Sequence, residues 1–150
     1  TITISATGGG GGGGGFSNGQ SISVTNLVVT GNTTLNTFKF VPRVSSTSSI
    51  TSPLAWNSDN FDQYVATAQS TALTINADSG TPNNGQRIIF RFKDNGTARA
   101  LTWTTGSSKS FRAIGVTLPT TTIINKTLYV GAIYNTTDER WDVIAVAQES

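Results

Sequence analysis

Almost every residue between 85 and 147 belongs either to an alternating β-strand or to a turn that joins two strands, and this feature constrains the chain more than any other in its sequence. Within residues 86–93, three apolar side chains alternate with three basic ones: Ile88, Phe90 and Phe92 against Arg87, Arg91 and Lys93. Side chains of a strand alternate between its two faces, so this strand has one apolar face and one basic face. Asn95 and Gly96 follow, a pair that is typical of a type I′ hairpin turn. The sequence therefore predicts a hairpin that joins residues 86–93 to residues 98–104 on an antiparallel scaffold.

Eight short strands are predicted in the C-terminal part of the chain, each separated from the next by turn residues. They fall near residues 63–68, 72–77, 86–93, 98–104, 110–114, 121–125, 128–135 and 140–147. Residues 135–139 form the loop of a second predicted hairpin, which sets one row of side chains against another: Leu128, Val130, Ala132 and Tyr134 opposite Trp141, Val143, Ala145 and Ala147. Eight strands without helical periodicity predict an antiparallel β-sandwich or jelly-roll domain over residues 61–150.

The composition excludes several classes of function. The chain has no cysteine and no histidine, which removes disulfides, cysteine zinc sites and the commonest general base. Only 12% of the residues are charged, the net charge is +2, and the ten basic residues form no cluster. A nucleic-acid interface needs a basic stripe, and a membrane span needs about 20 consecutive apolar residues, so neither partner is expected. No cofactor is expected either.

The first 20 residues combine a short alternating segment, residues 1–6, with eight successive glycines at 8–15. Glycine has no side chain to bury and the largest backbone entropy to lose, so one interpretation is a flexible tether or anchor. The alternative is a symmetric assembly in which glycine backbones pack where no Cβ would fit. No Gly-Lys-Ser/Thr follows the run, which argues against a phosphate-binding loop. Thr1 is compatible with a trimmed initiator methionine and with a fragment of a longer chain.

Residues 21–41 consist of short β-like pieces separated by turn residues. A lone ribbon of this kind is marginal in water, so identical copies are expected to cover its apolar side chains. The run Leu-Val-Val-Thr-Gly-Asn-Thr-Thr-Leu, residues 27–35, resembles the short repeats in the β-structured shafts of bacteriophage fibres. That resemblance implies a homotrimer with apolar residues facing the threefold axis. The candidates for that axis are Ile22, Val24, Leu27, Val29, Leu35 and Phe38.

Residues 42–60 are predicted to be a junction loop, because serine, threonine, asparagine and proline dominate them. Trp56 is the large anchor of this segment. We expect it to plug the core beneath the loop rather than to serve as a ligand platform.

Four motifs follow one another in the predicted domain: Leu-Thr-Ile-Asn-Ala-Asp at 73–78, Gly-Gln-Arg-Ile-Ile-Phe-Arg-Phe-Lys-Asp-Asn-Gly-Thr at 85–97, Leu-Thr-Trp at 101–103, and Leu-Tyr-Val-Gly-Ala-Ile-Tyr-Asn with Trp-Asp-Val-Ile-Ala at 128–145. Their order resembles the C-terminal β-domain of many phage tail-fibre and head-fibre proteins. The resemblance implies an all-β, homotrimeric and non-enzymatic fibre on the outer surface of a virion, with a β-ribbon shaft before the domain. The N-terminal segment would bind a capsid or tail protein, and the domain would contact a glycan or protein of the host surface.

The candidates for receptor contact are aromatic and basic side chains of the domain: Trp103, Tyr129, Tyr134, Arg91 and Arg99. Aromatic rings can stack on sugars, but they can equally belong to a core or a trimer interface. The basic face of residues 86–93 can bind acidic glycans, or it can simply keep an exposed strand soluble. A monomeric carbohydrate-binding module is therefore the alternative function.

A third function, a polysaccharide depolymerase, depends on the neighbouring carboxylates Asp59 and Asp62. Glycoside hydrolysis needs two carboxyl groups about 5–9.5 Å apart, one of them with a raised pKa. Aspartates in a loop rich in serine and asparagine are more simply turn formers. A calcium site that involves Asp59, Asp62 or Asp78 lacks the Asp-x-Asp-x-Asp loop that would support it.

Overall fold

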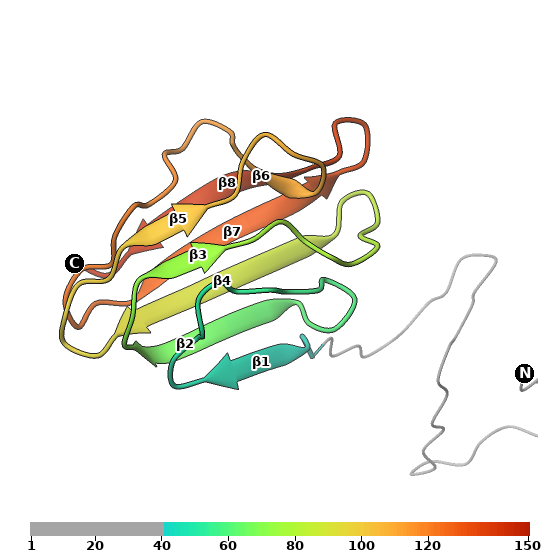
Figure 1. The fold of residues 1–150 in the computed structure, drawn as a ribbon. Helices are drawn as coiled ribbons and strands as arrows, with labels where there is room; N and C mark the ends of the chain where they lie inside the picture. The colour runs from blue at the N-terminus through green and yellow to red at the C-terminus, as the bar shows by residue number, and fades with distance from the viewer. Residues whose placement is uncertain (1–40) are drawn as a thin grey trace, which may run out of the picture. The chain divides into compact units, whose positions relative to one another are not determined.

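Two β-sheets make up residues 41–150, the part of the chain that the computed structural model describes (Figure 1). The strands are β1 (Val44–Thr47), β2 (Gln63–Gln69), β3 (Leu73–Ile75), β4 (Arg87–Asp94), β5 (Leu101–Trp103), β6 (Ser110–Ala113), β7 (Leu128–Asn135) and β8 (Arg140–Gln148). A six-stranded sheet has the order β1-β2-β4-β7-β8-β6, and β3 pairs with β5 in a second sheet. No helix occurs within residues 41–150, so the prediction of an all-β fold is confirmed.

The six-stranded sheet is mixed, and the prediction of a purely antiparallel domain is wrong. From β2 to β6 the chain passes alternately through the large sheet and the small one, so β2 and β4 are separated by a crossover through β3. A crossover brings the chain back in the same direction, which makes the neighbouring strands parallel. The pairs β1 with β2, β2 with β4, β3 with β5 and β6 with β8 are all parallel, whereas β4 with β7 and β7 with β8 are antiparallel.

The predicted hairpin at Asn95 and Gly96 does not form. Gly96 adopts the positive φ of 91° that the Asn-Gly signal indicates, but β4 pairs with β2 and β7, and β5 pairs with β3. The turn leads the chain from one sheet to the other, so Phe92 and Trp103 pack against each other across the core, with their ring centroids 6.3 Å apart and their planes inclined by 56°. The buried Asp94 holds this turn, because its carboxylate accepts hydrogen bonds from the backbone N–H groups of Gly96 and Asn125 at 3.0 and 2.9 Å.

The second predicted hairpin is confirmed, with a change of register. Tyr134 lies opposite Trp141 and Ala132 opposite Val143, as the sequence predicts. Ile144 is then an extra residue in β8, a β-bulge that shifts the following pairs. Val130 therefore faces Val146, Leu128 faces Gln148, and Ala145 and Ala147 move to the exposed face of the sheet rather than the predicted inner one.

Two further segments differ from prediction. Residues 121–125 form no strand: Thr121 makes an isolated bridge with Ala100, and the buried Thr122 donates its hydroxyl to Asp94 at 2.8 Å. The predicted junction, residues 42–60, supplies the edge strand β1 and the core side chains Leu54 and Trp56. Trp56 is buried as expected, and its indole N–H donates to the Asn76 carbonyl at 2.7 Å.

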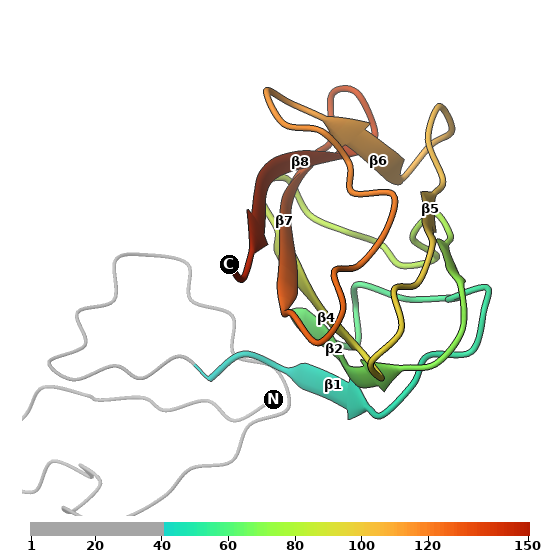
Figure 2. The ribbon, with the colours of Figure 1, turned by 90° about the vertical axis from the view of Figure 1, so that its left-hand side faces the viewer.

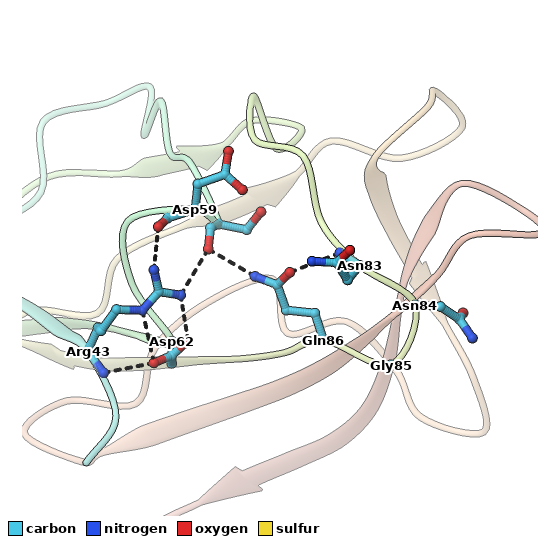
Figure 3. A pocket seen from close by; sticks show the side chains of 8 residues that line it. Arg43, Asp59, Asp62, Asn83, Asn84, Gly85 and Gln86 are labelled. Atoms are coloured by element: carbon cyan, nitrogen blue, oxygen red, sulfur yellow. Dashed lines mark hydrogen bonds and ion pairs between the residues drawn. The ribbon is translucent and has the colours of Figure 1, made fainter. Parts of the chain in front are cut away.

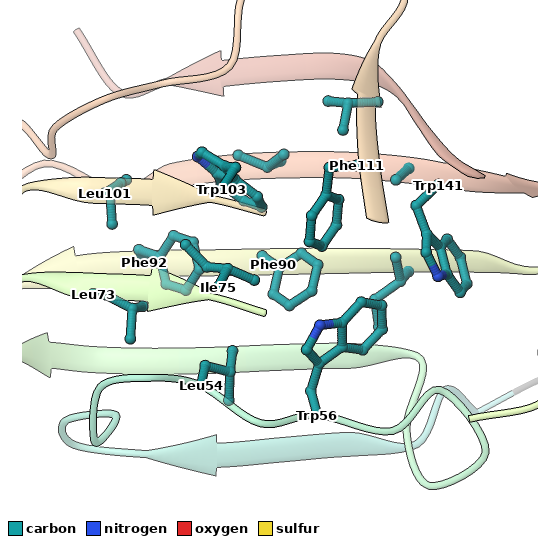
Figure 4. Packing of buried hydrophobic residues seen from close by; sticks show 14 of the residues in the cluster. Leu54, Trp56, Leu73, Ile75, Phe90, Phe92, Leu101, Trp103, Phe111 and Trp141 are labelled. Carbon is teal, nitrogen blue, oxygen red and sulfur yellow. The ribbon is translucent and has the colours of Figure 1, made fainter. Parts of the chain in front are cut away.

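The core lies between the two sheets and is dominated by aromatic rings (Figure 4). Phe90 contacts Trp56, Trp103 and Phe111 in edge-to-face arrangements, with ring centroids 5.2 to 5.8 Å apart. Such pairs add about 0.5–1.5 kcal/mol beyond the burial of their area. β3 and β5 cover one face of the large sheet (Figure 2), and among residues 41–150 no strand covers the other face, which we call the outer face.

Candidate functional site

The strand register defines the side chains of the outer face. One row of paired residues crosses five strands: Val44, Gln63, Ile89, Gly131 and Ala145. The next row contains Ser46, Val65, Arg91, Tyr129 and Ala147. Paired residues of neighbouring strands share a face, because side chains alternate along each strand in step. The first of these rows is therefore apolar except for Gln63, which separates Val44 from Ile89.

Four large apolar side chains of this face are exposed: Val44 by 52%, Ile89 by 42%, Tyr129 by 40% and Ile144 by 49%. The small residues Gly131 and Ala145 follow Ile89 in its row, whereas Gln63 stands between Ile89 and Val44. We call the four exposed residues, together with Gly131 and Ala145, the apolar band. Scattered exposed apolar residues are normal on proteins, but a contiguous group on a sheet marks a contact surface.

Arg91 and Tyr129, both predicted to contact a receptor, lie side by side as a cross-strand pair of β4 and β7. With Lys93, Thr67 and Thr127 they line a shallow hollow of about 150 Å³. Among residues 41–150, neither Arg91 nor Lys93 forms an ion pair. The hollow can therefore take an anionic group beside an aromatic ring.

The other three predicted contact residues lie elsewhere. Trp103 and Tyr134 are core residues, 8% and 6% exposed, and burial raises the pKa of the Tyr134 hydroxyl, with the charge of Glu139 adding to the shift. Arg99 lies before β5, where its guanidinium donates to the Asn95 side chain at 2.8 Å. The two buried rings offer no surface to a sugar, and Arg99 does not lie on the strands that carry Arg91 and Tyr129.

A second hollow, of about 510 Å³, surrounds Arg43 just before β1 (Figure 3). The Arg43 guanidinium donates to both oxygens of Asp62, at 2.7 and 3.2 Å, and to the backbone carbonyls of Ser58 and Asp59. Gln86 donates to the same Ser58 carbonyl at 2.9 Å. These bonds tie the start of β1 to the loop before β2, so the groups that line this hollow are largely engaged in holding the fold together.

The carboxylates of Asp59 and Asp62 lie at this hollow but have different partners. Hydrogen bonds from Arg43 hold the pKa of Asp62 below its usual range, although partial burial opposes the shift. A glycosidase acid needs the opposite shift. The Asp59 carboxylate accepts bonds from the Thr81 N–H and hydroxyl at 3.0 to 3.1 Å. Each carboxylate thus ties the loop to a distant segment, whereas a turn-forming aspartate would bond to the backbone of its own turn.

Asp78 lies in the interior, 4% exposed, and its four hydrogen bonds come from protein groups. Its carboxylate accepts from the Ser58 N–H and hydroxyl, from the Gly80 N–H and from the Trp141 indole, at 2.6 to 3.2 Å. No group of three or more acidic side chains that could hold a metal ion occurs within residues 41–150.

The six predicted axis residues, Ile22, Val24, Leu27, Val29, Leu35 and Phe38, lie outside the described residues. Within residues 41–150, no helix has the length and apolar character needed to cross a membrane. Comparisons with protein-family models, with curated proteins and with solved structures each found no match.

Sequence reasoning missed the apolar band, although two signals for it are present. Ile89 interrupts the otherwise basic outward positions Arg87, Arg91 and Lys93. Gly131 stands in the middle of a strand, where glycine often marks the close approach of another backbone. Ala145 carried no such signal, because the bulge at Ile144 reverses its face.

Proposed function

We propose that this chain is a structural protein of a bacteriophage virion, a homotrimeric head or tail fibre that displays its β-domain for attachment to the host. Residues 1–20 anchor the chain to a capsid or tail protein. Residues 21–41 form a trimeric β-ribbon shaft, and the two packed sheets form a sandwich-like tip on the outer surface of the virion. No catalytic role is assigned.

The apolar band is the observation that supports this proposal most. It lies on a rigid all-β unit whose first strand, β1, directly follows a segment predicted to need cover from identical copies. Copies held together by a shaft would give the tip several host contacts at once, and effective concentration then multiplies weak affinities.

Light scattering on the purified full chain tests the proposal. A fibre gives a native mass of three times the chain mass of 15.7 kDa, and labelled antibody finds the protein on the outside of intact virions. A stable monomer would overturn the proposal.

A second candidate, a monomeric carbohydrate-binding module, is favoured by the exposed Tyr129 beside Arg91 and Lys93. Binding of the full chain to acidic glycans on an array, with a monomeric mass in the same buffer, would support this candidate instead. Loss of that binding in Tyr129→Ala, but not in Tyr64→Ala, would assign it to the hollow, because Tyr64 lies on the inner face of β2 against Phe61.

A further inference from the structure

We infer that the outer face of the six-stranded sheet is a contact between copies of this chain, with the apolar band at its centre. The inference deepens the homotrimer proposed above and rests on it. It concerns residues 41–150, and so it places a copy contact in the domain itself rather than only in the predicted shaft.

The shape of the band suits a second sheet or strand. Gly131 has no side chain and lies between Ile89 and Ala145 in one row, so the sheet surface is low at its middle. A Cβ added to Gly131 would lie 3.6 Å from the Ala145 Cβ, which is ordinary contact. The fold therefore does not require glycine at this position, whereas the close approach of another chain would favour it.

Charged side chains flank the band at both ends, as a rim flanks the core of an interface. At one end Arg112 pairs with Asp142 at 2.7 Å and with Asp138 at 2.8 Å. At the other end stand Arg91 and Lys93. Tyrosine and arginine, both present here, are enriched in protein interfaces.

The size of the outer face fits a copy contact that acts together with a second contact in the proposed shaft. Strands about 4.8 Å apart with residues about 3.3 Å apart give the paired parts of the five strands, up to Lys93, a flat area of about 450 Å². Stable interfaces bury about 800 Å² on each partner, and crystal-packing contacts generally less than about 400 Å². The face is thus larger than an incidental contact and smaller than a complete interface, which suits copies already joined by a shaft.

An acidic saccharide is the competing occupant, and the observations favour it less. It would use Arg91, Lys93 and Tyr129 at one end of the face, but the apolar band has few side-chain donors or acceptors for sugar hydroxyls, and the hollow of about 150 Å³ is small for a ligand site. In the trimer, Tyr129 then lies within the copy contact, with Arg91 beside it.

Because the chain has no cysteine, a single introduced cysteine reports directly whether its surface is accessible to solvent or covered by another molecule. Ile89→Cys and Ala145→Cys place a thiol in the band, and Ile123→Cys is the matched control, since Ile123 is 52% exposed in a loop outside the outer face. The measurement is the rate of maleimide labelling of the full chain under native conditions, with light scattering on the same samples and circular dichroism to verify the fold.

In a trimer we expect both band thiols to react about tenfold or more slowly than the control thiol, because labelling must wait for the contact to open. A trimer whose band thiols react as fast as the control thiol would overturn this inference and leave the proposed function standing. A monomeric wild-type chain would overturn both the copy contact and the proposed function. Slow labelling of the band that appears only when polygalacturonate is added would assign the face to an acidic saccharide and overturn the copy contact.

Discussion

The indole N–H of Trp141 donates to the carboxylate of Asp78 at 3.2 Å, although 63 residues separate them in the chain. This bond joins β8 to the loop that follows β3, and the same carboxylate holds the Ser58 and Gly80 N–H groups. Asp78 therefore connects three distant segments in the interior of the unit.

Replacing Asp78 by alanine leaves three buried N–H donors without an acceptor. Each unsatisfied buried donor costs about 1–3 kcal/mol, so we expect the free energy of unfolding to fall by about 3 kcal/mol or more. Denaturant titration followed by tryptophan fluorescence measures it. The exposed Asp59→Ala is the control and should cost less than about 1 kcal/mol. Similar losses in both variants would contradict the prediction.

Stability at low pH should depend on Asp94. Burial raises the pKa of its carboxyl, but hydrogen bonds from Asn125, Thr122 and Gly96, with the charge of Arg99, outweigh burial and lower the pKa. A lowered native pKa contributes stability above the pKa of the unfolded chain, and that contribution is lost as the pH falls through the native pKa. The advantage of the wild type over Asp94→Asn should be constant above about pH 5 and shrink below about pH 4. An advantage that does not change with pH would refute this role.

Trp103 and Tyr129 should respond in opposite ways to truncation. Trp103 packs against Phe90, Phe92 and Phe111, so Trp103→Ala should cost about 3–5 kcal/mol of stability. Tyr129 is half in solvent, and Tyr129→Ala should cost about 1 kcal/mol while weakening contacts of the outer face. Thermal unfolding monitored by circular dichroism separates the two. Equal costs would show that the assignment of core and surface is incorrect.

Two glycines provide a matched comparison. Gly96 has a φ of +91°, which side chains disfavour, so Gly96→Ala should destabilise the unit by about 1–2 kcal/mol. Gly131 is not in that region, and its added Cβ meets Ala145 at an ordinary distance, so Gly131→Ala should leave the fold almost unchanged. The midpoints of urea unfolding test both. A larger loss for Gly131→Ala than for Gly96→Ala would run against the geometry.

Local alternation predicted most strands well, because the alternation of side chains between the two faces of a strand depends on that segment alone. β7 matches its predicted range of 128–135, and β4 differs from prediction by one residue at each end. The same alternation placed Tyr134 with Leu128 and Val130 on the inner face, which is where it lies, and so it already argued against a receptor contact at Tyr134. Tyr129 falls on the opposite face and is exposed.

The pairing of strands could not be predicted from local signals. Asn95 and Gly96 specify a turn, but which strand β5 joins depends on distant partners: Leu101 pairs with Leu73, and Trp103 pairs with Ile75 and packs against Phe92. The outer face depends in the same way on a bulge, since one extra residue at Ile144 decides on which side Ala145 lies. Distant contacts set both outcomes.

β4 is held on one side by β2, which precedes it, and on the other by β7, which follows 33 residues after β4 ends. A sheet built in this way has a high contact order, because its paired residues lie far apart in the chain. Such chains fold slowly, since the loops must close before the central strand pairs can form. During synthesis, the edge of β4 stays open until β7 leaves the ribosome, so a chain that stops short of β7 presents an unpaired strand to its neighbours and is prone to aggregate.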